Sequence, residues 1–384
     1  MMAAQDGHPC KSRPSARVGG GANPHFHGAG IPPILPSRRN LLSRLTRRSP
    51  SRNGRPDQAP VAARSHRRFG DDRYVPLDLL RYRQQLAQLA DQGIFIGTSS
   101  WKYPGWCGLI YDEQRYLTRS KFSESKFNRE CLADYAETFR TVCVDAGYYQ
   151  FPTDSFIGGM CEQVPDGFKF AFKVTDEITL KNFPNLPRFG VRAGTINENF
   201  LNEEMFQRLF LGPCEPFRSK IGPLIFEFST FHNQEFERGR DFVAALNQFL
   251  SELPKGWEYG VEIRNRAWLQ PEYFAMLRSH GVAHVFNNWT RMPSIGEQIA
   301  IEGSETADFS VSRFLLKPGR SYEDSVKAFQ PYTEIKEPNE EARGAARQIL
   351  QQSMVKKRKG YIYVNNRLEG CAPMTIDGFL PRNY

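Results

Sequence analysis

Eight short segments rich in β-branched and aromatic residues recur along the last ~290 residues of the chain, and stretches with helical patterning separate most of them. The segments cover residues 94–99, 141–149, 168–174, 223–229, 257–265, 282–289, 308–316 and 359–366. Alternation of strands with helices is typical of a parallel sheet, because parallel neighbours need a crossover connection. Eight such units predict an α/β fold, a (β/α)8 TIM-like barrel, rather than an open doubly wound sheet.

Amphipathic stripes mark several of the expected helices. One stripe runs from Phe242 to Leu253 and another from Ala342 to Leu350. A further helix should begin near Asp78, since four leucines follow at roughly helical spacing, namely Leu79, Leu80, Leu86 and Leu89. The long connection 174–223 also has helical spacing and is expected to lie near the barrel mouth. No Gly-rich nucleotide-binding motif follows any of the segments.

Basic residues are concentrated at the start of the chain. The net charge of +9 divides into +11 for residues 1–70, which hold 13 Lys or Arg against Asp6 and Asp57, and −2 for the remainder. The Arg-, Ser-, Pro- and Gly-rich composition of this segment predicts a disordered N-terminal tail over residues 1–70, followed by a barrel domain over residues 71–384. Two interpretations of the tail stay open: an arm that binds nucleic acid or another polyanion, and a solvated segment or a translation start placed too far upstream.

Cysteine usage and hydropathy bear on location. The seven cysteines show no C-x-x-C spacing, which favours a reducing cytosol. No run of about 18 apolar residues occurs, so we expect a cytoplasmic protein without a membrane span. The segment from Pro36 to Leu42 imitates a twin-arginine export signal, but arginines interrupt the apolar stretch that should follow it. The histidines lack ligand spacing, so we predict no metal site, and the sequence indicates no particular cofactor.

Polar residues stand at the expected strand ends. In a TIM-type barrel, catalytic side chains come from the C-terminal ends of the strands and from the loops that follow. Six segments offer such groups there, namely Asp145, Tyr149, Lys173, Glu227, Glu262, Arg264, Asn287, Asn288, Asn365 and Asn366. These side chains predict a site for a polar small molecule at the C-terminal mouth.

Glu262 is the leading candidate for a general acid or base. A carboxylate partly removed from water at a barrel mouth has its pKa raised toward the working pH. Arg264 follows two residues later and faces the same way. Either Arg264 is a planar clamp for a carboxylate or phosphate of the ligand, or it forms an internal ion pair with Glu262.

Several other polar residues are candidates for the site, and some of them have two interpretations. Lys173 is predicted as an electrostatic group or a Schiff-base amine, although a lysine at a strand end is more often solvated. Asp145 is the third catalytic candidate. Asn365 and Asn366 either orient a polar ligand through their amides or turn the chain after the last strand. Asn288 is a further candidate for ligand binding.

Aromatic residues follow the first two segments. Trp101, Tyr103 and Trp106 form a set suited to stacking on a sugar ring or base. Packing in the core is the alternative role for these large side chains. Tyr149, at the end of the second segment, is also a candidate for contact with the ligand.

The chain from about Phe95 to Leu380 resembles the DUF72 (YecE-like) family, whose members are TIM-type β/α barrels of unassigned activity. The matching stretches, in family order, are Ile96-Gly97-Thr98-Ser99-Ser100-Trp101 with Tyr103-Pro104 and Trp106, Phe139-Arg140-Thr141-Val142, Tyr148-Tyr149-x-x-Pro152, Phe168-Lys169-Phe170 with Lys173, Gly222-Pro223-Leu224-Ile225-Phe226, Gly260-Val261-Glu262-Ile263-Arg264 with Trp268, and Val364-Asn365-Asn366. One stretch departs from the family pattern. Where the family usually has Glu-x-Asn on its second strand, this chain has Cys143 and Asp145.

These observations favour an enzyme that acts on a polar, anionic or hydroxylated small molecule, with Glu262 as the acid or base. Two alternatives stay open. One is a nucleic-acid-associated binding protein that uses the basic tail, whose affinity would fall steeply with salt. The other is a barrel scaffold without catalysis, which the fold alone does not exclude.

Overall fold

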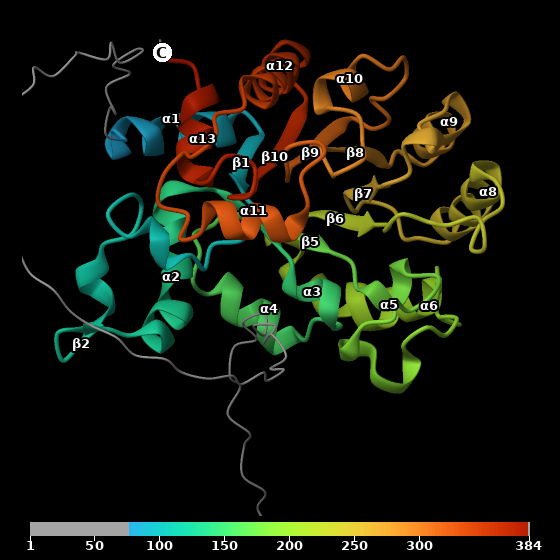
Figure 1. Cartoon of the computed structure of the whole chain (residues 1–384), viewed down its shortest axis with the longest axis horizontal. Helices are drawn as coiled ribbons and strands as arrows, with labels where there is room; N and C mark the ends of the chain where they lie inside the picture. Colours follow the sequence, from blue (N-terminus) through green and yellow to red (C-terminus); the bar gives the residue numbers. More distant parts are fainter. Residues whose placement is uncertain (1–76, 383–384) are drawn as a thin grey trace, which may run out of the picture. The chain divides into compact units, whose positions relative to one another are not determined.

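The structure, a computed structural model, describes residues 77–382. Eight parallel strands close into a barrel in the order β1-β10-β9-β8-β7-β6-β5-β4 (Figure 1). Their bounds are β1 Ile94–Thr98, β4 Thr141–Val144, β5 Lys169–Lys173, β6 Ile221–Glu227, β7 Tyr259–Glu262, β8 Ala283–Asn287, β9 Phe309–Phe314 and β10 Lys359–Val364. The predicted β/α barrel is therefore confirmed.

All eight predicted strands are present, but the second and the fifth were predicted too long. The fifth, β7, ends at Glu262, so Arg264 lies beyond the end of its strand. β4 ends at Val144, and the expected continuation forms the short helix α3 (Ala146–Tyr149). Aromatic residues favour strands in a sequence pattern, yet pairing with β5 stops at Val144. Asp145 already has helical backbone angles, and Gly147 packs so closely on β5 that a Cβ there would lie 2.9 Å from the carbonyl oxygen of Lys173. The chain therefore leaves the sheet at this point.

Helices surround the barrel (Figure 1). The α-helices of five or more residues are α1 Leu79–Asp91, α2 Glu124–Thr138, α4 Asp154–Cys161, α8 Gly239–Ser251, α9 Pro271–His280, α10 Ile295–Ile299, α11 Tyr322–Phe329, α12 Glu340–Lys356 and α13 Ala372–Phe379. A short hairpin of β2 (Leu117–Thr118) and β3 (Lys121–Phe122) precedes α2. The side chain of Asp78 caps α1 by accepting from the amide of Arg81, so the predicted start is confirmed. Leu80, expected on the buried stripe, is exposed because it lies on the opposite face of α1.

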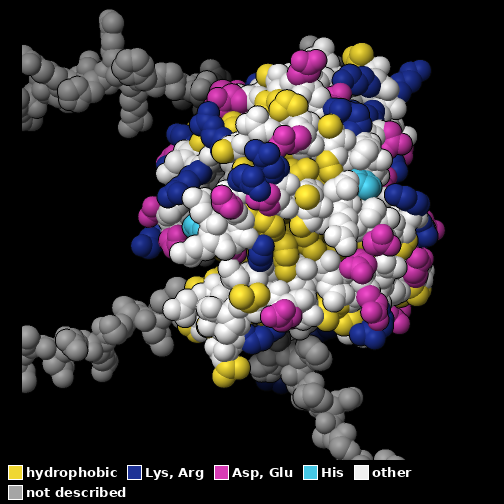
Figure 2. Space-filling view, turned by 90° about the vertical axis from the view of Figure 1, so that its right-hand side faces the viewer, with side chains coloured by type: hydrophobic (Ala, Val, Ile, Leu, Met, Phe, Trp, Pro, Cys, Tyr) yellow, Lys and Arg dark blue, Asp and Glu magenta, His cyan; other side chains and the backbone are white. Residues whose placement is uncertain are grey.

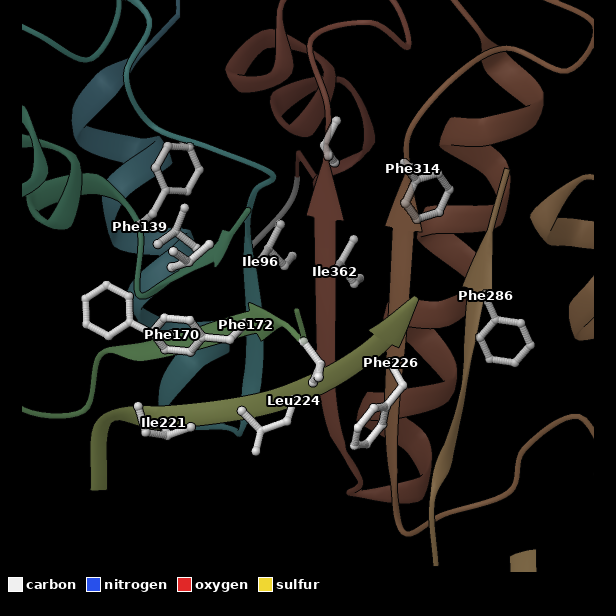
Figure 3. Packing of buried hydrophobic residues seen from close by; sticks show 14 of the residues in the cluster. Ile96, Phe139, Phe170, Phe172, Ile221, Leu224, Phe226, Phe286, Phe314 and Ile362 are labelled. Atoms are coloured by element: carbon white, nitrogen blue, oxygen red, sulfur yellow. The ribbon is translucent and has the colours of Figure 1, made fainter. Parts of the chain in front are cut away.

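The barrel wall separates two apolar clusters. Outward-facing residues such as Phe172, Phe226 and Ile362 pack in the large cluster between the strands and the helices (Figure 3). The residues at alternate positions fill the barrel interior, namely Phe95, Cys143, Ala171, Ile225, Ala283, Val285, Phe309, Val311, Tyr361 and Tyr363. This period of two follows from strand geometry, and it fixes which later residues of each strand face the barrel axis.

The connection from β5 to β6 contains three short α-helices, α5 (Asp176–Thr179), α6 (Glu203–Met205) and α7 (Gly212–Cys214), together with 3-10 and π-helical turns. Leu180, Phe183 and Phe189 of this connection form a small apolar cluster of their own. Since the connection leaves the C-terminal end of β5, it begins at the barrel mouth, as the sequence predicted.

Two further sequence-based predictions concern the N-terminal tail and membrane spans. The disordered tail of residues 1–70, with its proposed binding of nucleic acid, lies outside the described residues. Between residues 77 and 382, no helix combines the length and the apolar character needed to span a bilayer.

Candidate functional site

One polar residue from each strand is placed to face the barrel axis, within one residue of the strand's C-terminal end. Each lies two positions after a residue of the interior cluster or after a glycine, and therefore on the same face of its strand. These residues are Ser99 of β1, Asp145 of β4, Lys173 of β5, Glu227 of β6, Glu262 of β7, Asn287 of β8, Arg313 of β9 and Asn365 of β10. We call this set the polar layer. It is the boundary between the apolar barrel interior and the mouth.

Arg313 is the centre of the polar layer. Its Nη1 donates to Glu262 Oε2 at 2.5 Å and to Glu227 Oε2 at 2.6 Å. Its Nη2 lies 3.6 Å from Asp145 Oδ1. Burial opposes the charge of this guanidinium, but Glu262 and the other nearby acidic groups outweigh burial and raise the pKa of Arg313. Arg313 therefore stays charged and connects three strands across the barrel.

Glu227 contacts three cations. Its Oε1 lies 2.7 Å from Arg264 Nη2, while its Oε2 lies 2.9 Å from Lys173 Nζ and 2.6 Å from Arg313 Nη1. Burial alone would raise the pKa of Glu227, but Arg264, Lys173 and Arg313 hold it well below the usual range of a glutamate. Glu227 is therefore ionised and organises the cations around it.

Glu262 lies beside Glu227, because the two residues are paired in the ladder between β6 and β7. Its side chain is 0% exposed, and its Oε2 accepts from Arg313. Its Oε1 accepts from Nη2 of Arg264 at 3.3 Å and from Nε at 3.4 Å. The internal ion pair considered for Glu262 and Arg264 is thus present, although Glu227 is the closer partner of Arg264.

Arg264 and Lys173 occupy the side of the ion-pair network nearer to solvent, since each side chain is 10% exposed against 3% for Arg313. The guanidinium carbon of Arg264 lies 3.8 Å from the centre of the Trp289 ring. Lys173 Nζ lies 4.0 Å from the centre of the Tyr148 ring. Burial lowers the pKa of Lys173, but Glu227 and Asp145 outweigh burial and raise it. Lys173 is therefore a charged group here, which does not suit a Schiff-base amine.

Asp145 is the most accessible charged residue of the polar layer, with a side chain that is 38% exposed. It precedes α3 but makes no capping hydrogen bond to that helix. Its buried Oδ1 accepts no hydrogen bond from residues 77–382, and the nearest cation is Arg313. Asp145 is thus a carboxylate at the mouth whose acceptor capacity is not used by the fold.

Three further members of the polar layer have a buried polar atom without a hydrogen-bond partner in the described part of the chain: Ser99 Oγ, Asn287 Oδ1 and Arg313 Nε. Asn287 Nδ2 donates to the carbonyl oxygens of Ile263 and Val285, which fixes the amide so that the unpaired atom is its oxygen. Buried polar groups are normally hydrogen-bonded, so these atoms indicate a polar ligand or ordered water at the mouth.

The amide oxygens of the candidate asparagines are used by the fold. Asn288 Oδ1 accepts from the Leu315 amide at 2.6 Å, and Asn365 Oδ1 accepts from the Arg367 amide at 3.0 Å. Asn366 Oδ1 accepts from Ala372 N and from Trp106 Nε1, whereas its buried Nδ2 has no partner among residues 77–382. Asn366 therefore keeps one donor for a ligand, and Asn288 and Asn365 mainly shape the loops.

The aromatic candidates differ in their surroundings. Trp101 and Trp106 are buried in the large apolar cluster, where Tyr103 packs against Trp106 with ring centres 4.8 Å apart. The buried Nε1 of Trp101 has no partner within the described residues. Tyr149 is 59% exposed on α3, and the guanidinium carbon of Arg188 lies 5.2 Å from its ring centre. The two tryptophans thus pack in the core, while Tyr149 lies at the surface.

Arg313 was missed by the sequence analysis, although it has more partners in the polar layer than any other residue. The segment 308–316 shows a single arginine among serines and hydrophobic residues, a pattern that is also typical of a half-exposed edge strand. The useful signal is positional: Arg313 stands two residues after the interior residue Val311, as Glu227 stands two residues after Ile225. Comparison of the strands by this period of two would have found it.

A closed barrel of eight parallel strands with a polar layer at its C-terminal mouth defines this chain as a TIM-type β/α-barrel protein. Residues 95–382 match the model of the family described as protein of unknown function DUF72, and the chain belongs to this family. No curated protein matches the chain.

Solved structures of DUF72 family proteins are similar to this chain. One from Enterococcus faecalis is 19% identical, with a TM-score of 0.50, over 76% of this chain and 96% of that protein. One from Thermotoga maritima is 20% identical, with a TM-score of 0.49, over 74% of this chain and 97% of that protein. The likeness to the Enterococcus faecalis structure, at 19% identity, concerns the fold.

Proposed function

We propose that this barrel is an enzyme whose C-terminal mouth binds the anionic group of a small polar molecule. The proposal rests on one observation. Three cations, Lys173, Arg264 and Arg313, surround only two fully buried carboxylates, Glu227 and Glu262. The third carboxylate, Asp145, is partly solvated, so the buried part of the network has an excess of positive charge.

An anion at the mouth would reach Lys173 and Arg264 before Arg313, because these two side chains are the more exposed. Both are held in place by Glu227, and both lie against an aromatic ring, which limits the side-chain motion that binding would have to restrict. A guanidinium suits carboxylate and phosphate groups because it donates two parallel hydrogen bonds. The site is therefore organised before the ligand arrives.

Proton transfer by this site would need a carboxylate that reaches the ligand. Glu262 is covered by Arg264 and Arg313, so it contacts a bound molecule only after Arg264 moves. Asp145 needs no such movement, because its side chain is partly exposed. We therefore propose Asp145 as the acid or base and Glu262 as the residue that positions the two arginines.

The nucleic-acid interpretation depends on the basic segment 1–70, which lies outside the described residues, and the barrel face shown in Figure 2 adds no basic surface to that segment. On this side, near α8 and α9, Lys and Arg side chains are interspersed with Asp and Glu around a band of hydrophobic side chains. A nucleic-acid interface would need basic side chains gathered in a patch or stripe.

Anion binding is tested by calorimetric titration with inorganic phosphate at low salt. Lys173→Met and Arg264→Met should each weaken binding at least tenfold, since a charge-assisted hydrogen bond contributes about 1.5–3 kcal/mol. Both variants leave Glu227 paired with Arg313, so the fold should persist. Lys356→Met is the matched control, because it removes the same charge near the start of β10, at the opposite end of the barrel. Equal affinity for phosphate in the unmodified protein and in all three variants would contradict the proposal.

Catalysis is tested separately by incubating the protein with a library of small phosphates and carboxylates and following their consumption by mass spectrometry. Asp145→Asn should bind phosphate as well as the unmodified protein but lose consumption at least a hundredfold. Consumption that survives Asp145→Asn and is lost in Glu262→Gln would return the acid-base role to Glu262. Binding without any consumption would support a binding protein rather than an enzyme.

A further inference from the structure

The unpaired atoms of the polar layer indicate which groups the ligand has besides its anionic group. Two of them, Asp145 Oδ1 and Asn287 Oδ1, can only accept hydrogen bonds. Asn287 is 0% exposed, and its amide orientation is fixed by its two donated hydrogen bonds. An anionic group, whose oxygens are acceptors, would satisfy Lys173 and Arg264 but neither of these oxygens.

Resting on the function proposed above, we infer that the ligand of this mouth carries at least one hydroxyl group besides its anionic group. The hydroxyl donates to Asn287 Oδ1 or Asp145 Oδ1, while the anion lies against Lys173 and Arg264. The ligand class is thus a hydroxylated anion, either a hydroxy acid or the phosphate ester of a polyol.

A hydroxyl suits this position better than an ammonium group. Asn287 and Arg313 are paired in the ladder between β8 and β9, so a cation beside Asn287 would lie close to the guanidinium of Arg313. Lys173 and Arg264 add positive charge to the same layer. A neutral donor avoids this repulsion. Ser99 Oγ and Arg313 Nε, also buried without partners among residues 77–382, can then donate to the lone pairs of the same hydroxyl or of its neighbour.

The cations and the unpaired polar atoms come from different strands, so they form two halves of the mouth. The cations that would meet the anion come from β5 and from the end of β7, with Glu227 of β6 between them. The unpaired atoms come from β1, β4, β8 and β9. In the ring order these four strands lie on either side of the run β7-β6-β5, with β10 between β1 and β9. A ligand that reaches both halves therefore has its hydroxyl and its anion on different atoms of its skeleton.

The test compares two probes that differ only in hydroxyl groups, glycerol 3-phosphate and n-propyl phosphate. Calorimetric titration of the full chain should give at least tenfold tighter binding of glycerol 3-phosphate, because n-propyl phosphate leaves the buried acceptors unpaired. Glycerate and propionate form a second pair, which distinguishes a carboxylate from a phosphate as the anion. A preference for the hydroxylated member of either pair supports the inference.

Variants locate the preference. Asp145→Ala should reduce the ratio of the affinity for glycerol 3-phosphate to the affinity for n-propyl phosphate to about 2 or less, since it removes an acceptor for the hydroxyl. Asp166→Ala, which removes the same charge from a fully exposed position, should keep the ratio. Asn287→Ala should also reduce the ratio of the two affinities, and circular dichroism checks that this variant is folded.

Equal affinity for the members of both pairs would overturn the inference and leave anion binding intact, since water alone would then serve the unpaired atoms. Failure of all four probes to bind would instead contradict the proposed function itself. A ratio that is unchanged in both Asp145→Ala and Asn287→Ala would also overturn the inference, because the hydroxyl would then be recognised elsewhere.

Discussion

Arg313 donates to Glu262 across a distance of 2.5 Å, in a place where the arginine side chain is 3% exposed and the glutamate 0%. A salt bridge so deep in a protein is stable only with good geometry and further hydrogen bonds. Glu227, Arg264 and Lys173 supply those contacts. These five charged side chains therefore form one connected network, and removal of its centre should have larger effects than removal of its edge.

Arg313→Met should lower the free energy of unfolding by about 3–5 kcal/mol, because it leaves Glu262 buried with only its longer contacts to Arg264. Denaturation by guanidinium chloride measures this loss. Arg129→Met serves as a control, since Arg129 pairs with Glu130 at the surface, and it should cost no more than about 1 kcal/mol. Adding Glu262→Gln to Arg313→Met should restore part of the stability. A loss below about 1 kcal/mol for Arg313→Met would show that the network is not an energetic unit.

His284 should make the fold sensitive to mild acid. It is buried on the outer face of β8, where its Nδ1 lies 3.2 Å from the hydroxyl of Tyr273, and burial lowers its pKa from 6.5 to about 4. The unfolded chain therefore binds this proton at a higher pH than the folded chain, so stability falls as the pH drops from 6.5 to 4.

The expected contribution of His284 to this loss is about 3 kcal/mol over that interval. Comparison of urea denaturation for the unmodified protein and for His284→Gln at pH 7, 5.5 and 4.5 isolates it. The difference in unfolding free energy between the two proteins should shift in favour of the variant as the pH falls. Parallel stability curves would refute the assignment of a buried neutral histidine.

Gly260 leaves room for the side chain of Val285 in the barrel interior, one layer below the polar layer. A Cβ at this position would lie 2.8 Å from Val285 Cγ2 in the barrel interior. Gly260→Ala should therefore destabilise the protein by about 1–3 kcal/mol through overpacking. Gly344→Ala in α12 is the matched control: its Cβ would meet no atom within 4 Å, so it should stabilise the protein by about 0.5–1 kcal/mol. Thermal unfolding of both variants gives the comparison, and equal signs would contradict this account of the interior.

The barrel was predicted well because the local composition of the chain indicates where its strands lie. The segments that became β6 and β10 are dense in apolar and aromatic residues, and their positions needed no long-range information. Strand ends were less accessible to prediction, since the end of β4 depends on pairing with β5 rather than on the tyrosines that follow. Propensity reports the local preference of the chain and not the length of a ladder.

The site was predicted in part for a related reason. Glu262, Arg264, Lys173 and Asp145 were found as polar residues at strand ends, and the structure brings all four into one network. The depth of each charged side chain below the barrel mouth depends on how the strands are arranged around the barrel. Arg313 connects Glu227, Glu262 and Asp145 from three other strands, and no spacing along the chain records these contacts.

A crystal structure of the protein with glycerol 3-phosphate tests the central claim most directly. The account predicts the phosphate within hydrogen-bonding distance of Lys173 Nζ and the Arg264 guanidinium, with a hydroxyl donating to Asn287 or Asp145 at about 2.7–2.8 Å. Phosphate bound away from Lys173 and Arg264, or a mouth that holds only water at saturating ligand, would contradict it.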